Sequence, residues 1–169
     1  MGNDIRLAGV IRESIVDGPG IRFVVFTQGC FHNCKGCHNV GTHNPNGGYL
    51  SNTDNLLNAI KQNPMLKGVT LSGGEPFEQA EKLIEFAKEV HKLGLDIVVY
   101  SGYTFEQIIG KSKVKKEWLE LLKECDILID GKFILEQKSL TLNFRGSKNQ
   151  RIIDVKKSLK IGVPVEIEL

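Results

Sequence analysis

Short apolar segments rich in β-branched residues recur along the chain, and turn-forming residues bound each of them. This pattern is typical of strands. It predicts strands over residues 5–11, 21–27, 68–72, 96–100 and 127–130. The last three are short and apolar, which indicates that they are buried.

A second pattern, in which apolar residues recur every three or four positions, predicts helices between the strands. The clearest helix covers residues 78–93, and Gly94 directly after it supplies a stop signal. Three further helices fit the pattern, over residues 54–62, 105–109 and 115–123.

Strands that alternate with helices indicate mostly parallel pairing through right-handed crossovers. A complete eightfold barrel needs about 250 residues, whereas this chain has 169. We therefore predict an α/β fold, an incomplete TIM-like barrel with an open, curved, mostly parallel sheet and outer helices. Residues 1–169 contain no obvious linker or internal repeat, which indicates a single domain. In such sheets, ligands bind at the carboxyl ends of the strands.

Composition narrows the class of protein only a little. Hydrophobic residues make up 41% and charged residues 25%, as in ordinary globular proteins. A net charge of +2 gives no reason to expect nucleic acid or a membrane as a partner. The chain has no apolar run long enough to span a bilayer. Residues 1–4 do not resemble the start of a signal peptide, so we expect a cytoplasmic location.

Three of the four cysteines, Cys30, Cys34 and Cys37, lie within eight residues. In a cytoplasmic protein, clustered cysteines mark metal or redox sites more often than disulfides. Cysteine thiolates normally ligate all four irons of a four-iron cluster. Three clustered cysteines would therefore leave one iron free to bind a small molecule, and an open coordination position usually serves chemistry.

A structural zinc site is the alternative interpretation of the same loop. The fourth ligand would then be His32, His38 or His43. Structural zinc usually takes two separated pairs of ligands, and the sequence has no second pair of cysteines. The remaining cysteine, Cys125, lies between a predicted helix and a predicted strand, where a small buried hydrophobic residue is expected.

Two polar turns follow predicted strands at what should be the same edge of the sheet as the cysteine loop. The glycines of Gly73-Gly74-Glu75 let the backbone approach a ligand closely, and the carboxylate can accept hydrogen bonds from an ammonium group. Asp130 and Lys132 end a later strand and could bind hydroxyls and a carboxylate. Each turn, taken alone, also fits an ordinary connection between elements.

The spacing Cys-x3-Cys-x2-Cys after an early strand, combined with Gly73-Gly74-Glu75, resembles the radical S-adenosylmethionine (SAM) superfamily. The resemblance implies a [4Fe–4S] cluster on the three cysteines, with SAM chelating the fourth iron. It also implies contacts to SAM from Gly36, Cys37, His38, Gly73, Gly74, Glu75, Asp130 and Lys132. Gly36 stands where many members have an aromatic residue, so side-chain stacking from this position is not expected.

Two further segments resemble the activases of glycyl radical enzymes. The sequence Asp-Gly-Pro-Gly-Ile-Arg, from Asp17 to Arg22, precedes the cysteine loop as it does in those activases. Asp17 and Arg22 are accordingly expected to contact the partner protein. Residues 144–154 resemble the small activases of anaerobic ribonucleotide reductase. From the residues alone, the first segment is a rigid turn and the second a polar, basic loop that enters a short strand.

This resemblance implies a reaction in which a one-electron donor, such as flavodoxin, reduces the cluster. SAM then splits into methionine and a 5′-deoxyadenosyl radical, which takes a hydrogen atom from a glycine Cα of the reductase large chain. No side chain need act as an acid or base. Lysines within residues 111–116 indicate a solvated face that could also dock an acidic donor.

Three other functions remain compatible with the sequence. The chain could activate a different glycyl radical enzyme. It could be a radical SAM enzyme that acts on a small molecule, since such an enzyme and an activase would both cleave SAM. It could also be a zinc-binding interaction module, in which case the protein would be colourless rather than brown.

Overall fold

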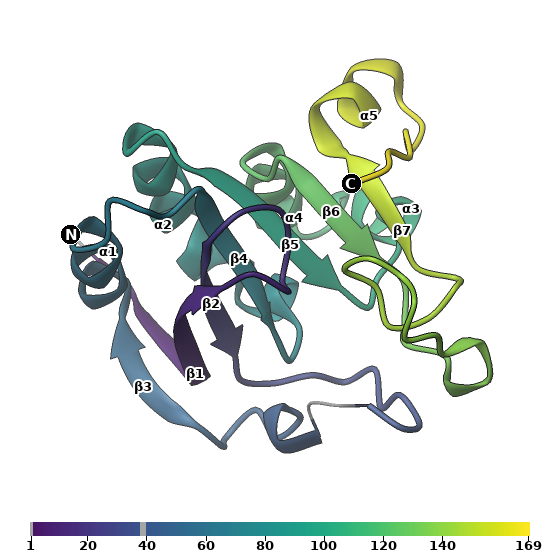
Figure 1. Ribbon diagram of the computed structural model, residues 1–169, viewed down its shortest axis with the longest axis horizontal. Coiled ribbons are helices and arrows are strands. Elements are labelled where there is room, and N and C mark those ends of the chain that lie inside the picture. The colour runs from purple at the N-terminus through teal and green to yellow at the C-terminus, as the bar shows by residue number, and fades with distance from the viewer. Residues whose placement is uncertain (1, 38–39) are drawn as a thin grey trace.

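Within residues 2–37 and 40–169, which the computed structural model describes, the chain forms one seven-stranded sheet with helices packed against it (Figure 1). The strands lie in the order β3-β1-β2-β4-β5-β6-β7. Their bounds are β1 (Asp4–Ser14), β2 (Arg22–Thr27), β3 (Tyr49–Asn52), β4 (Gly68–Gly73), β5 (Asp96–Ser101), β6 (Ile127–Asp130) and β7 (Arg151–Asp154). Strands β2, β4, β5 and β6 pair in parallel, and the pairings outside them are antiparallel.

Four of the helices form a single layer, because α1 packs on α2 and α4 packs on both α2 and α3. Contacts of α1 with β1 and of α2 with β5 place this layer against one face of the sheet (Figure 1). The helices are α1 (Thr53–Lys61), α2 (Ala80–Lys92), α3 (Phe105–Ser112), α4 (Lys116–Lys123) and α5 (Val155–Ile161), with short 3-10 turns η1 (Val40–Thr42), η2 (Pro76–Gln79) and η3 (Leu135–Gln137). None of the described helices is long and apolar enough to cross a membrane.

The predicted open α/β sheet, with its parallel centre and its helices on the outside, is confirmed. The five predicted strands and the four predicted helices are all present, with small shifts at their ends. The hydrophobic pattern does not predict β3, because this edge strand has only four residues and Tyr49 and Leu50 are exposed. Strand β3 forms because its backbone pairs with the first half of β1.

The main core fills the space between the sheet and the helix layer, where Phe77, Phe86 and Trp118 are buried. A smaller cluster of Val98, Ile129 and Ile152 lies apart from it and packs against loop residues such as Phe144. The loop over residues 15–21 crosses in front of the sheet, on the side away from the helices (Figure 1). Loops rather than helices cover this face of the sheet, and the candidate functional site described below lies on it.

Arg22 anchors this loop to the sheet. Its guanidinium is fully buried, and it forms an ion pair of 2.5 Å with Asp96. It donates to Thr70 Oγ1 at 2.8 Å and to the carbonyl oxygens of Pro19 and Val69. The expectation that Arg22 contacts a partner protein is therefore wrong, because every part of the side chain is used inside the protein.

We expect Arg22→Ala to lower the free energy of unfolding by about 3 kcal/mol, because it removes a fully buried guanidinium and leaves the Asp96 carboxylate and the Val69 carbonyl without this donor. Urea denaturation followed by circular dichroism measures this difference. Arg12→Ala is the matched control, since Arg12 is exposed on β1, and it should change stability by less than about 0.5 kcal/mol. Equal stability of the two variants would show that the buried ion pair is dispensable.

Candidate functional site

The cysteine loop leaves the carboxyl end of β2 and is held at both of its ends by backbone hydrogen bonds. Gly29 N–H donates to the Thr42 carbonyl at 2.6 Å, and Cys30 N–H donates to the His43 carbonyl at 3.1 Å. Glu75 N–H donates to the Gly29 carbonyl at 2.8 Å, which ties the loop to the end of β4. These bonds fix both ends of the loop against the sheet.

Within this loop, a tight turn separates the last two cysteines. Cys37 N–H donates to the Cys34 carbonyl at 3.2 Å, and Gly36 between them has φ of 76°. This left-handed backbone favours glycine. A Cβ at this position would also lie 2.9 Å from a methyl group of Leu135. The backbone therefore explains why Gly36 stands where an aromatic residue is common.

All three cysteines line one pocket, together with the glycines at the end of β4. The walls are formed by Cys30, His32, Cys34, Cys37, His43, Ser72, Gly73, Gly74, Tyr100, Ser101, Gly102, Ile129, Gly131, Phe133 and Gln150. Each of the three thiols is partly exposed. The structure thus brings the cysteine loop and the glycine turn together, as the sequence predicts from the strand ends.

Burial is the main cause that raises the pKa of the Cys30 thiol to about 11; the negative charges of Glu75, Cys34 and Cys37 add to the shift, and a hydrogen bond from the His32 backbone N–H opposes it. Burial also raises the pKa of Cys34, while a hydrogen bond from the Phe133 N–H and the charge of Lys132 lower it. Three thiolates in this pocket would repel one another. A positively charged iron centre removes that repulsion and keeps coordinating thiols deprotonated.

The donor set fits an iron–sulfur cluster. Three thiols face a shared pocket, and backbone N–H groups of His32 and Phe133 hydrogen-bond the Cys30 and Cys34 sulfurs. Such hydrogen bonds to sulfur are one of the factors that set the reduction potential of a cluster. Among the residues that the structure describes, no three His, Cys, Asp or Glu side chains converge on one point as the ligands of a single metal ion do.

Gly73 and Gly74 are required by close backbone packing. A Cβ on Gly73, whose φ is 100°, would lie 2.4 Å from Thr27 N, and one on Gly74 would lie 2.5 Å from the Gly29 carbonyl oxygen. Gly74 N–H also donates to the Thr27 carbonyl at 2.8 Å. The missing side chains therefore let β4 end directly against the start of the cysteine loop.

The Glu75 carboxylate is fully buried and turned toward the protein. One oxygen lies 2.6 Å from His32 Nε2 and accepts from Gly102 N–H at 2.8 Å. The Ser101 hydroxyl lies 2.9 Å from both carboxylate oxygens, and Phe77 N–H donates to the second at 3.1 Å. Glu75 thus joins three elements: the cysteine loop, the end of β5 and the turn η2.

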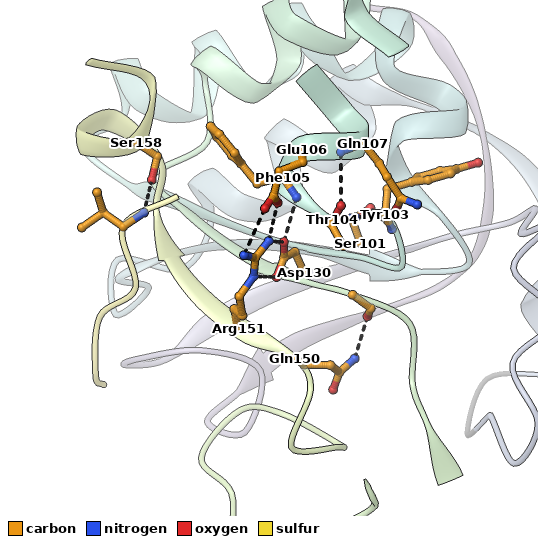
Figure 2. Close-up of polar contacts among 12 residues, drawn as sticks. Ser101, Tyr103, Thr104, Phe105, Glu106, Gln107, Asp130, Gln150, Arg151 and Ser158 are labelled. Carbon is orange, nitrogen blue, oxygen red and sulfur yellow. Dashed lines mark hydrogen bonds and ion pairs between the residues drawn. The ribbon is translucent and has the colours of Figure 1, made fainter. Parts of the chain in front are cut away.

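Asp130 is also buried and already bound within the protein (Figure 2). Its carboxylate accepts from Arg151 Nε at 3.0 Å and Nη2 at 2.6 Å, and from the Phe105 N–H at the start of α3 at 2.7 Å. Arg151 also pairs with Glu106 at 2.6 Å. Both carboxylates raise the pKa of Arg151, and Arg151 lowers the pKa of Glu106. Asp130 therefore holds β6, β7 and α3 together, and its neighbour Gly131 lines the pocket.

Lys132 is exposed and lies close enough to Cys34 to lower the pKa of that thiol. Its neighbours in the chain, Gly131 and Phe133, both line the cysteine pocket. The prediction for His38 lies outside the described residues. Of the other two histidines considered as zinc ligands, His43 lines the pocket, and His32 is turned into the contact with Glu75.

A larger hollow of about 890 Å³ adjoins the cysteine pocket and shares Cys37, Ser72, Tyr100, Phe133 and Gln150 with it. Its other walls are Ile15, Val16, Asp17, Leu140, Leu142, Asn143, Phe144, Arg145 and Gly146. Asp17 reaches this hollow from the glycine-rich turn, where its carboxylate accepts from the Ser14 hydroxyl at 2.6 Å. Asp17 is only partly buried, whereas Arg22 is fully buried.

Sequence reasoning misses Ser101, Gly102, Phe133 and Gln150 as pocket residues. For Ser101-Gly102 a signal exists, because it follows a buried strand just as Ser72-Gly73 does. Parallel strands end at one edge, so two Ser-Gly steps after buried strands should meet. Phe133 and Gln150 have no such signal, since the loop between β6 and β7 positions them.

Comparison with known proteins identifies the family. Residues 16–153 match the model of the 4Fe-4S single cluster domain. The chain is 37% identical over 146 residues to the anaerobic ribonucleoside-triphosphate reductase-activating protein of Enterobacteria phage T4, covering 81% of this chain and 86% of the phage protein. The chain belongs to this family of activating proteins. The protein of the same name from Haemophilus influenzae is 35% identical, over 82% of this chain and 90% of its own length.

Among solved structures, the crystal structure of QueE from Escherichia coli is similar to the chain with a TM-score of 0.48 and 17% identity. The likeness covers 60% of this chain and 54% of QueE. Membership of the activating-protein family rests on the sequence matches, which span most of both chains.

Proposed function

We propose that this chain activates the large chain of anaerobic ribonucleotide reductase by generating a glycyl radical on it. Cys30, Cys34 and Cys37 hold a [4Fe–4S] cluster, and SAM occupies the pocket between these cysteines and Gly73-Gly74. A cluster held there would supply the electron that cleaves SAM into methionine and a 5′-deoxyadenosyl radical, and this radical would remove a hydrogen atom from a glycine Cα. The domain over residues 1–169 carries the whole site.

One observation carries the proposal: three partly exposed thiols and a side-chain-free turn of β4 face each other in one pocket that opens into a larger hollow. The protein's part is to bind and orient, because the cofactor carries the chemistry. Gly73 and Gly74 line the pocket on the side where we place the methionine end of SAM.

The predicted SAM contacts among the described residues divide into two groups by where they lie relative to the pocket. Gly36, Cys37, Gly73, Gly74 and Lys132 lie at or beside the pocket, and we assign them to SAM binding. Glu75 and Asp130 lie beneath it, where they fix the turns that present Gly73-Gly74 and Gly131. Glu75 additionally places a buried negative charge below the expected position of the SAM ammonium group.

The hollow beside the cysteine pocket is assigned to the glycine-bearing segment of the reductase. It is open and is lined by apolar side chains, of which Ile15, Val16 and Leu140 are strongly exposed. Asp17 at its rim can accept backbone hydrogen bonds from that segment. The electron comes from a one-electron donor, for which flavodoxin is our proposal.

The test is electron paramagnetic resonance of the reductase. After anaerobic reconstitution, mixing with SAM, a reductant and the reductase large chain should give an organic radical signal that changes when the reductase carries deuterated glycine. Omitting SAM should abolish the signal. Cleavage of SAM without a protein radical would favour a small-molecule substrate, and a colourless protein that fails to cleave SAM would favour the zinc-binding module.

A further inference from the structure

We propose that an acidic one-electron donor protein docks on the exposed lysines of residues 111–116, and that Tyr103 and His32 connect this surface to the cysteine loop. We call Lys111, Lys113, Lys115 and Lys116 the lysine face. The proposal rests on the proposed function, because it assigns the entry point of the electron which that function requires.

The lysine face is a local concentration of positive charge. Four of its six consecutive residues are lysines, none is acidic, and Val114 in the middle is 88% exposed. No lysine of this face forms an ion pair with an acidic group among the described residues, whereas Lys88 and Lys92 on α2 pair with Glu85 and Glu89. An unpaired basic patch around an exposed apolar residue is complementary to an acidic partner surface.

Aromatic rings join the lysine face to the site. Lys111 Nζ lies 5.2 Å from the centroid of the Tyr103 ring. The Tyr103 ring lies 4.3 Å from the His32 ring, edge to face, and 5.0 Å from the Trp118 ring. His32 lies between Cys30 and Cys34 in the chain, and its backbone N–H hydrogen-bonds the Cys30 sulfur. Two rings therefore separate the surface lysine from a cysteine that holds the cluster.

This connection is short and rigid. The His32 side chain is only 6% exposed and lies 2.6 Å from Glu75, and its ring packs against Gly102, where a Cβ would lie 2.4–2.7 Å from it. The Tyr103 hydroxyl donates to Glu78 at 2.7 Å. Electron transfer weakens steeply with distance, so fixed rings in contact favour it. One electron leaves the donor and enters the cysteine-held centre, and no bond or proton moves.

The position of the lysine face leaves the reductase site free. It lies at the end of α3 and in the turn before α4, and these helices belong to the layer behind the sheet. The loop over residues 15–21, which lines the larger hollow, crosses the opposite face (Figure 1). A donor on the lysine face and a reductase segment in the hollow can thus bind at the same time.

Charge reversal of Lys113 and Lys116 tests the docking surface, since neither contacts an aromatic ring. With the full-length reconstituted protein and flavodoxin, Lys113→Glu combined with Lys116→Glu should weaken binding at least tenfold at low salt, measured by calorimetry. The difference should shrink as salt is added. Flavodoxin-driven SAM cleavage should fall likewise, whereas dithionite-driven cleavage should stay unchanged. Lys157→Glu combined with Lys160→Glu, exposed on α5, is the control and should bind flavodoxin normally.

The ring connection is tested separately with Tyr103. Tyr103→Leu should retain flavodoxin binding but slow cluster reduction by flavodoxin, measured by stopped-flow absorbance, and Tyr103→Phe should restore it. If the double lysine variant binds flavodoxin as the parent protein does, the lysine face is not the docking surface. If flavodoxin reduces the Tyr103→Leu protein at the parent rate, the electron does not pass through Tyr103. If dithionite fails to drive SAM cleavage in the parent protein, the proposed function fails, and the calorimetric comparison still decides the docking surface.

Discussion

Cys34→Ala is expected to abolish stable cluster binding and to reduce SAM cleavage more than about 100-fold. The loss of outer-shell groups alone typically costs 10–100-fold in metal affinity or activity, and Cys34 is assigned as a direct ligand. Its sulfur lies in the same pocket as Cys30 and Cys37, so no other described thiol can replace it. Iron and sulfide analysis after anaerobic reconstitution, together with product analysis by chromatography, measures both effects.

Cys125→Ala is the matched control, because Cys125 is a cysteine far from this chemistry. It is fully buried in the main core, its pKa is raised by burial, and its Sγ lies 3.3 Å from the Leu121 carbonyl oxygen. The control should hold a full cluster and cleave SAM at the parent rate, with a stability loss of about 1 kcal/mol. A Cys34→Ala protein that retains both iron and cleavage would refute the ligand assignment.

The central part of the fold is predictable because its strands and helices have strong periodic patterns. The α2 helix repeats buried residues at helical spacing, and β4, β5 and β6 are short apolar runs. The edge strand β3 is not predictable in this way, since its residues are partly exposed and its backbone partner is distant in sequence. Its formation depends on pairing with β1 rather than on its own side chains.

In the site, the sequence predicts where residues lie along the strands but not the direction of their side chains. The sequence predicts correctly that Glu75 and Asp130 lie at the carboxyl ends of parallel strands, which meet at one edge of the sheet, and that Arg22 lies near the start of a strand. It does not determine where their side chains point. Arg151 and the start of α3 bind Asp130, and Asp96 binds Arg22. These partners lie at least 21 residues away along the chain, so only the folded arrangement reveals which charges are internal.

The second prediction with a large effect concerns Glu75, which is proposed both to fix the turn below the pocket and to place a negative charge near SAM. Glu75→Gln separates these two roles. The substitution keeps the size of the side chain and removes its charge. Both carboxylate oxygens of Glu75 accept a backbone N–H group, and in glutamine one of them is replaced by an NH2 group, which donates. We therefore expect a stability loss of about 1–3 kcal/mol. Because the SAM ammonium group loses a buried negative charge below it, SAM affinity should fall at least tenfold, while the iron content stays at the parent level.

Titration of the reconstituted variant with SAM, followed by the change in the electron paramagnetic resonance spectrum of the reduced cluster, measures that affinity. Glu78→Gln is the control, since Glu78 accepts from the Tyr103 hydroxyl and does not line the cysteine pocket. It should bind SAM like the parent protein. Parent-like affinity in Glu75→Gln would show that the Glu75 charge does not act on SAM.

Glu75→Ala extends the argument to the cysteine loop. Without a carboxylate, His32, Ser101, Gly102 and Phe77 lose a shared acceptor beneath the pocket. The loop would still be tied at Gly29 and Cys30 by backbone hydrogen bonds, so we expect the cluster to assemble and SAM affinity to fall further than in Glu75→Gln. Loss of iron from Glu75→Ala, but not from Glu75→Gln, would instead show that the hydrogen bond to His32 positions the cluster ligands.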